Sequence, residues 1–159
     1  MTVKRKHKAY LLWILLTEAI GALSGFLSRE GMKVYMEAVT KPSLSPPGWV
    51  FPVVWGILYA LLGIGVAMVY SAPPSHQRSR GLNLYIAQLV VNFFWSLIFF
   101  NAHAFGFAFF WLILLFVLVA GMVLAFMQVR LLSAKLQIPY LLWLLFAAYL
   151  NLGVWLLNP

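Results

Sequence analysis

The 159-residue chain is 64% hydrophobic and only 9% charged, and it contains no cysteine. A soluble domain carries about a quarter of its residues as Asp, Glu, Lys or Arg. A chain of this size with so few charges could not cover its apolar core in water, so we expect an integral membrane protein. The absence of cysteine excludes disulfides, thiol catalysis and thiolate metal sites.

The formal net charge of +8 raises the question of nucleic-acid binding. Four of the basic residues directly precede the first apolar run, and the others lie singly or in pairs between later runs. This distribution is typical of the cations that flank membrane helices, and it forms no single basic face. We therefore expect the lipid bilayer, and no nucleic acid, as a partner.

Five apolar runs are long enough to cross a membrane. A helix that spans the roughly 30 Å hydrocarbon core needs about 20 mostly apolar residues. The runs are continuous rather than alternating, which favours helices over strands. The prediction is an all-α membrane protein, a five-transmembrane-helix bundle that forms one domain over residues 1–159, with helices at about 9–28, 49–70, 82–101, 104–127 and 136–157.

The connection between the first two helices, residues 29–48, is long for so compact a protein. Long loops in compact domains are often lids or binding elements. A disordered tether is the alternative. The rigid pair Pro46-Pro47 restricts the backbone, which favours a lid that covers a pocket rather than a disordered tether.

The distribution of Lys and Arg between the loops predicts the orientation in the membrane. With the N-terminus in the cytoplasm, the outer segments hold three cations, Arg29, Lys33 and Lys41. The inner segments then hold eight, which are Lys4, Arg5, Lys6, Lys8, Arg78, Arg80, Arg130 and Lys135. This excess favours a cytoplasmic N-terminus.

Polar and aromatic residues recur at helical spacing in three of the predicted helices. Such stripes should face the bundle, because an amide that faces lipid leaves its donors and acceptors unpaired. Two interpretations remain open: hydrogen bonding between packed helices, or a pocket for a flat apolar ligand with a few polar groups. The stripes are Phe51, Trp55 and Tyr59; Gln88, Asn92, Trp95 and Phe99; and Tyr140, Trp143, Ala147 and Asn151.

One acidic residue, Glu18, lies near the middle of the first predicted helix. A charge at the bilayer centre costs about 2.5–3.5 kcal/mol on insertion scales. Glu18 is therefore expected to be protonated or paired in the bundle, and a role in proton or ligand binding is the alternative. No carboxylate pair, phosphate loop or Ser/His/Asp arrangement occurs, so neither a metal site nor a hydrolytic site is expected.

Three motifs resemble the signature of the translocator protein family, whose bacterial members are called tryptophan-rich sensory proteins. The first motif is KPSLSPPGWVFP at 41–52, followed by VWGILY at 54–59. The second is AQLVVNFFW at 87–95 with IFF at 98–100, and the third is PYLLW at 139–143 with FAAYLN at 146–151. They occur in the family's order and spacing, and the resemblance covers nearly the whole chain.

The resemblance implies a homodimeric five-helix bundle that binds porphyrins such as protoporphyrin IX, with no cofactor required. It also implies a pocket between the second, third and fifth helices, closed by the first loop. The carried-over positions are Trp55, Asn92, Trp95, Trp143 and Ala147, with Trp49 near the rim. Together with the stripes, the expected ligand-binding residues are Trp49, Phe51, Trp55, Tyr59, Gln88, Asn92, Trp95, Phe99, Trp143, Ala147 and Asn151.

The function implied is that of a receptor or sensor for tetrapyrroles and related apolar ligands, in a bacterial cytoplasmic membrane. One alternative is a light- and oxygen-dependent breakdown of bound porphyrin, in which Trp55 and Trp143 would be the reactive residues. The other is a small-molecule transporter. The chain departs from the family at Leu44, where a tryptophan is usual, and this predicts a weaker grip of the loop on a flat ligand.

Overall fold

The computed structural model describes residues 3–159, with side chains from His7 onward. Within these residues the chain is all-helical, and five segments are long and apolar enough to cross a membrane. The predicted five-helix membrane architecture is confirmed. The segments are α1 (Val3–Leu27), α3 (Val50–Tyr70), α4 (His76–Ser96) continued by η1 (Leu97–Asn101), α5 (Phe105–Val129), and α6 (Leu131–Lys135) followed by α7 (Ile138–Leu157).

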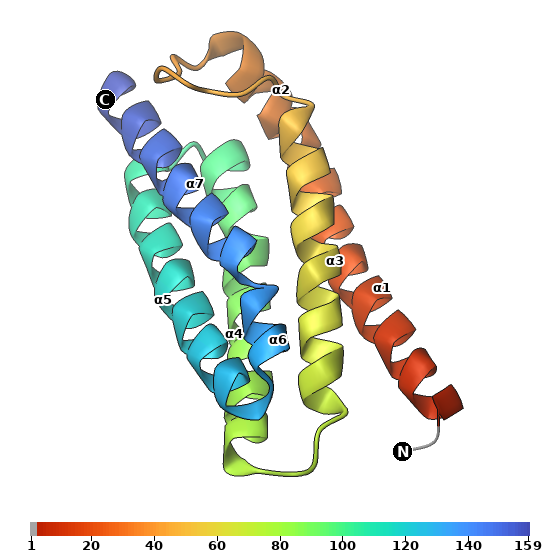
Figure 1. The fold of residues 1–159 in the computed structure, drawn as a ribbon. Coiled ribbons are helices and arrows are strands. Elements are labelled where there is room, and N and C mark those ends of the chain that lie inside the picture. Colours follow the sequence, from red (N-terminus) through yellow and green to blue (C-terminus); the bar gives the residue numbers. More distant parts are fainter. Residues whose placement is uncertain (1–2) are drawn as a thin grey trace.

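The long helices form two groups that run side by side (Figure 1). Helix α1 packs along α3, while α4 packs along α5 and α5 packs along α7. The short helix α2 (Arg29–Ala38) lies at the upper end of the bundle in Figure 1. The segment after α2 crosses this end toward the last residues of α7, where Thr40 and Asn158 exchange two hydrogen bonds.

Glycine allows α1 and α3 to approach each other closely. A Cβ atom at Gly63 would lie 2.6 Å from Cα of Ile14, so the α1 backbone passes directly over this glycine. Higher in the bundle the arrangement is reversed, because the ring of Tyr59 occupies the place that a side chain at Gly21 would need. Small residues have this role at many membrane-helix interfaces.

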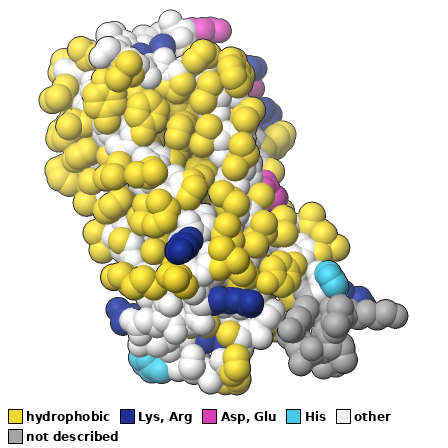
Figure 2. Space-filling model, viewed as in Figure 1, with side chains coloured by type: hydrophobic (Ala, Val, Ile, Leu, Met, Phe, Trp, Pro, Cys, Tyr) yellow, Lys and Arg dark blue, Asp and Glu magenta, His cyan; other side chains and the backbone are white. Residues whose placement is uncertain are grey.

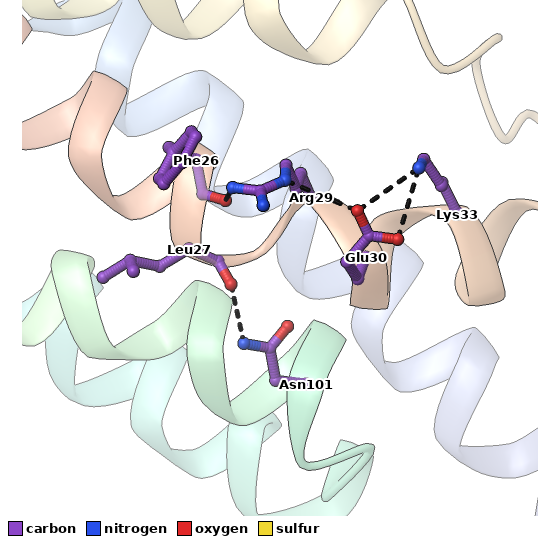
Figure 3. Close-up of polar contacts among 6 residues, drawn as sticks. All are labelled: Phe26, Leu27, Arg29, Glu30, Lys33 and Asn101. Carbon is purple, nitrogen blue, oxygen red and sulfur yellow. Dashed lines mark hydrogen bonds and ion pairs between the residues drawn. The ribbon is translucent and has the colours of Figure 1, made fainter.

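Hydroxyl and amide groups connect α1 to α4 and η1. The hydroxyls of Thr17 and Tyr85 lie 2.7 Å apart, and Ser24 Oγ donates to the Phe93 carbonyl at 3.0 Å. Near the upper end, Asn101 Nδ2 donates to the Leu27 carbonyl at 2.9 Å (Figure 3). Helix α1 is therefore held by α3 along one side and by these polar contacts along another.

The helix boundaries differ from the sequence prediction at several places, and the first helix begins at Val3 rather than at about residue 9. The third spanning helix begins at His76 rather than 82, because Ser75 caps it by accepting a hydrogen bond from the Arg78 backbone N–H. Its last turn is a π-helix, closed by a hydrogen bond from Ala102 N to Leu97 O. The segment 29–48 contains α2, a short amphipathic helix that buries Gly31 and Tyr35 one turn apart.

The surface is that of a membrane protein. Figure 2 shows hydrophobic side chains over most of the visible face, with Lys and Arg mainly in its lower part and near its upper edge. Large side chains such as Leu12, Phe110 and Leu142 are each more than 60% exposed. In water such a surface would drive aggregation, whereas in a bilayer it faces acyl chains.

Candidate ligand cavity

A cavity of about 530 Å³ lies between α1, α3 and α4, with α2 and η1 at its upper end. Ligand pockets in proteins are commonly about 300–1,000 Å³ and mostly apolar. Aromatic side chains make up much of its wall, and Asn92 adds an amide. The residues from α3, α4 and η1 include Phe51, Trp55, Tyr59, Asn92, Trp95 and Phe100.

The α1 wall of the cavity is built almost entirely from small residues. Glu18, Gly21, Ala22 and Gly25 lie on one face of the helix, and Ser28 continues this face just after α1 ends. Most of this face has little or no side chain, which leaves room beside the aromatic wall of α3 and α4.

Two glycines on facing helices line the cavity, Gly25 on α1 and Gly56 on α3. A Cβ atom at either position would meet no atom within 4 Å. Neither glycine is therefore required by the packing of the chain, in contrast to Gly63. Their effect on the structure is to keep the cavity open.

Trp55 is the central aromatic residue of the α3 wall. Its ring stacks on Tyr59, with centroids 5.4 Å apart and an interplanar angle of 28°. On its other side it meets Trp143 of α7 edge-on, at 6.4 Å and 87°. Trp143 itself is outside the cavity lining and faces a second, membrane-facing groove of about 390 Å³ between α3 and α7. Trp55 and Trp143 thus separate the cavity from this groove.

The polar stripes of α4 and α7 hydrogen-bond to each other. The Tyr140 hydroxyl donates to Gln88 Oε1 and accepts from Asn92 Nδ2, both at 2.8 Å. Trp95 Nε1 donates to Asn151 Oδ1 at 3.3 Å. The prediction that these stripes face the bundle is confirmed, because the amides and Tyr140 are almost fully buried. Asn92 and Trp95 both line the cavity and bond to α7, so the two interpretations of the stripes apply together.

The remaining residues expected to bind a ligand lie away from the lining. Gln88, Asn151 and Ala147 are buried between α4, α5 and α7, and Phe99 stacks on Trp95 with centroids 5.1 Å apart. Trp49 is 68% exposed just before the start of α3. The structure therefore brings five of the eleven predicted residues to one cavity, namely Phe51, Trp55, Tyr59, Asn92 and Trp95.

The upper end of the cavity is formed by α2 and the segment after it, which contribute Met32 and Gly48 to the lining. Tyr35 anchors α2 by packing its ring against Phe99 and Phe100, at 5.4 and 5.3 Å. Burial raises the pKa of Tyr35 to about 12, so the phenol stays neutral at physiological pH. Leu44 lies at the outer tip of this segment, 79% exposed and with a positive φ of 69°.

Lys41 ties the end of α2 to the following segment. Its ammonium donates to the carbonyls of Tyr35, Met36 and Val39 at 2.9–3.2 Å, and it lies 5.3 Å from the centre of the Tyr35 ring. These carbonyls are at the C-terminal end of α2, where a helix has unpaired acceptors and a cation is favourable.

Replacing Lys41 with methionine is expected to loosen the segment 36–48, because three charge-assisted hydrogen bonds are lost. Amide hydrogen exchange in this segment should accelerate about tenfold, while the five long helices exchange as in the parent protein. The matched control is Lys33→Met, which removes an exposed lysine of α2 whose ammonium bonds to the exposed Glu30 rather than to backbone carbonyls, within the described part of the chain. Equal exchange in the two variants would contradict this role of Lys41.

A cluster of charges surrounds Arg29 at the upper end of the cavity, which we call its mouth, and Figure 3 shows the contacts of this cluster. Arg29, which lines the cavity, places its guanidinium 4.0 Å from the centre of the Phe26 ring and 3.4 Å from Glu30. Lys33 reaches the same carboxylate at 3.2 Å. Since one carboxylate serves two cations, the mouth keeps a net positive charge.

Sequence reasoning missed the contribution of α1 to the cavity. The available signal was the recurrence of the small residues Gly21, Ala22, Gly25 and Ser28 on the side of the first helix that also carries Glu18. Among residues 3–159, no group of three His, Asp or Glu side chains is placed to hold a metal ion.

The comparisons with known proteins cover most of the chain. The model of the TspO/MBR family matches residues 13–156. The chain is 38% identical to the translocator protein of Homo sapiens, over 88% of this chain and 85% of that protein. It is 36% identical to Protein CrtK of Rhodobacter capsulatus, over 79% of each chain. It is 33% identical to the tryptophan-rich protein TspO of Chlorobaculum tepidum, over 89% of this chain and 90% of that protein.

Proposed function

The chain belongs to the TspO/MBR family of membrane proteins, and from this premise we propose that it is a receptor or sensor that binds porphyrins, such as protoporphyrin IX, in the cavity between α1, α3 and α4. The observation that carries the proposal is an aromatic cavity of about 530 Å³ inside the membrane-spanning bundle, kept open by two glycines that packing does not require. Flat apolar ligands suit such walls, because ring faces supply large contact areas.

The geometry suggests distinct roles for the residues of the proposed site. The macrocycle would contact four aromatic side chains, those of Phe51, Trp55, Tyr59 and Trp95. The amide of Asn92, which also lines the cavity, would be a polar contact for the ligand. Trp143 would act from behind Trp55 by holding its ring in place. Helix α2 and the segment to Gly48 would serve as a lid, and the net positive mouth would suit the carboxylates of the porphyrin.

Replacing Trp55 with leucine is expected to weaken protoporphyrin IX binding about tenfold, the loss that corresponds to about 1.4 kcal/mol of contact energy. Trp143→Leu should weaken binding less, because this ring is outside the cavity. Binding is followed by the absorbance of the porphyrin itself, which is independent of the number of tryptophans. The control is the exposed Trp49→Leu. Equal affinities for the parent and the Trp55 variant would remove Trp55 from the site.

A light- and oxygen-dependent breakdown of bound porphyrin is the second candidate. The observation that favours it is the ring contact of Trp55, on the cavity wall, with Trp143 behind it. An excited porphyrin is a photosensitiser, and a neighbouring indole can be oxidised without a dedicated acid or base. Illumination in air should then give a product with a new absorption spectrum. Bleaching at the same rate without protein would rule this activity out.

We further propose a homodimer in a bacterial cytoplasmic membrane with a cytoplasmic N-terminus. In Figure 1 the start of α4, which carries Arg78 and Arg80, and the junction of α5 and α6, at Arg130, lie at the lower end of the bundle. The three cations of α2 and the segment after it, at the upper end, are offset by Glu30 and Glu37. Labelling of single engineered cysteines at Ser75 and Ser43 in intact cells would test the orientation. Labelling of the Ser75 position from outside would contradict it.

A further inference from the structure

We propose that the cavity also takes flat aromatic ligands that carry a positively charged amine, with the Glu18 carboxyl group as the partner of that amine. This inference rests on the proposed function only in that the cavity between α1, α3 and α4 is a ligand site. It adds a second class of ligand, and it assigns a role to a residue that the porphyrin proposal does not use.

Glu18 is a carboxyl group that lies inside a spanning helix and lines the cavity. It lines the inner part of the cavity and is only partly buried. Among residues 7–159 it makes no hydrogen bond and no ion pair. A charged group in a membrane span normally faces a cavity or pairs with another group, because isolation in lipid is costly. The Glu18 carboxyl group can therefore bind a polar or charged group of a ligand that enters the cavity.

The amide and the two serine hydroxyls of the cavity wall within the spans already have partners. Ser24 and Ser96 bond to the Phe93 carbonyl, and Asn92 bonds to Tyr140. The Ser28 hydroxyl lacks a partner, but it is buried at the mouth, between α1 and α2. Among the residues that line the cavity, Glu18 is thus the acidic group, and its carboxyl group remains available to a ligand.

The surroundings of Glu18 suit a cation better than an anion. The wall of the cavity presents aromatic rings, of which Trp55, Tyr59 and Trp95 are the richest in π electrons. Cations are attracted to the faces of such rings, and aromatic cages recognise organic ammonium groups in this way. A carboxylate beside these rings adds a hydrogen-bond acceptor and, when ionised, an opposite charge.

The charges at the two ends of the cavity would also orient the ligand. Glu18 lies nine positions before Leu27, the last residue of α1, a rise of about 14 Å along the helix, and Arg29 begins α2 just beyond that end. Arg29 and its neighbours keep the mouth positive. An ammonium group therefore finds repulsion at the mouth and attraction at the inner end, so the amine of the ligand would point inward.

The test uses two tricyclic probes of nearly equal shape, 9-aminoacridine, which is cationic at neutral pH, and acridine, which is neutral. Both are titrated into the full-length protein in nanodiscs of zwitterionic lipid, with empty nanodiscs subtracted. The parent protein should bind the cation about tenfold more tightly than the neutral ring, and Glu18→Gln should remove that preference. The matched control is Glu37→Gln, an exposed carboxylate on α2 outside the cavity, which should keep it.

Equal affinity of the parent protein for the two probes would overturn the proposal, and so would a preference that survives in Glu18→Gln. Protoporphyrin IX binding is measured on the same samples. Its retention in Glu18→Gln, together with loss of the cation preference, supports the role of Glu18 and shows that the variant is folded. If the parent protein does not bind protoporphyrin IX, that result counts against the proposed function alone.

Discussion

Replacing Gly25 and Gly56 together with leucine is expected to weaken protoporphyrin IX binding severely while leaving the fold intact. Both glycines line the cavity, and a Cβ atom at either would meet nothing within 4 Å. The added side chains can therefore enter the cavity without displacing a neighbour. They would occupy the space between α1 and α3 into which a flat macrocycle must insert, and affinity should fall by about two orders of magnitude, or about 2.7 kcal/mol.

The measurement is a titration of the parent and double variant by porphyrin absorbance, with melting temperatures recorded in parallel. The control is Ala19→Leu, which adds the same side chain to α1 at an exposed position outside the cavity lining. It should bind porphyrin like the parent protein. Undiminished binding by a stable double variant would show that the ligand site lies elsewhere.

Replacing Gly63 with leucine is expected to have the largest effect on stability. A Cβ atom at this position would lie 2.6 Å from Cα of Ile14, so the obstacle is backbone, which cannot rotate away. Helices α1 and α3 would have to separate along the line where they pack most closely. Overpacking at a rigid site costs up to about 3 kcal/mol, and occasionally more.

This cost corresponds to a melting temperature lowered by roughly 6–12 °C for a chain of this size. The loss can be followed by thermal unfolding of the detergent-solubilised protein. Gly56→Leu is the natural comparison, because it makes the same change two turns earlier in the same helix but in front of open space. If both variants melt at the same temperature, the close approach of α1 to α3 at Gly63 is wrong.

The spanning helices could be predicted from sequence because lipid imposes a simple rule on the chain. Every backbone group in the hydrocarbon core must be paired within the segment, so continuous apolar runs of sufficient length become helices. The burial of Gln88, Asn92 and Asn151 followed from the same rule, since an amide that faces lipid has no partner. These predictions needed only composition and helical spacing.

The remaining features depend on contacts between distant segments. Helix α2 is short, and its helical form depends on Tyr35 packing against Phe99 and Phe100. The α1 side of the cavity exists because Gly25 faces open space rather than a neighbouring helix. Sequence spacing alone cannot distinguish a glycine that packs against a helix from one that lines a cavity. Gly63 and Gly56 illustrate this, because they lie on one helix and have opposite surroundings.

The most direct test is an experimental structure of the full chain with protoporphyrin IX bound. The account predicts the macrocycle between α1, α3 and α4, beneath α2, with one face against Trp55 and its edge beside Gly25. Density in the membrane-facing groove lined by Trp143 and Phe146, with the cavity empty, would contradict it.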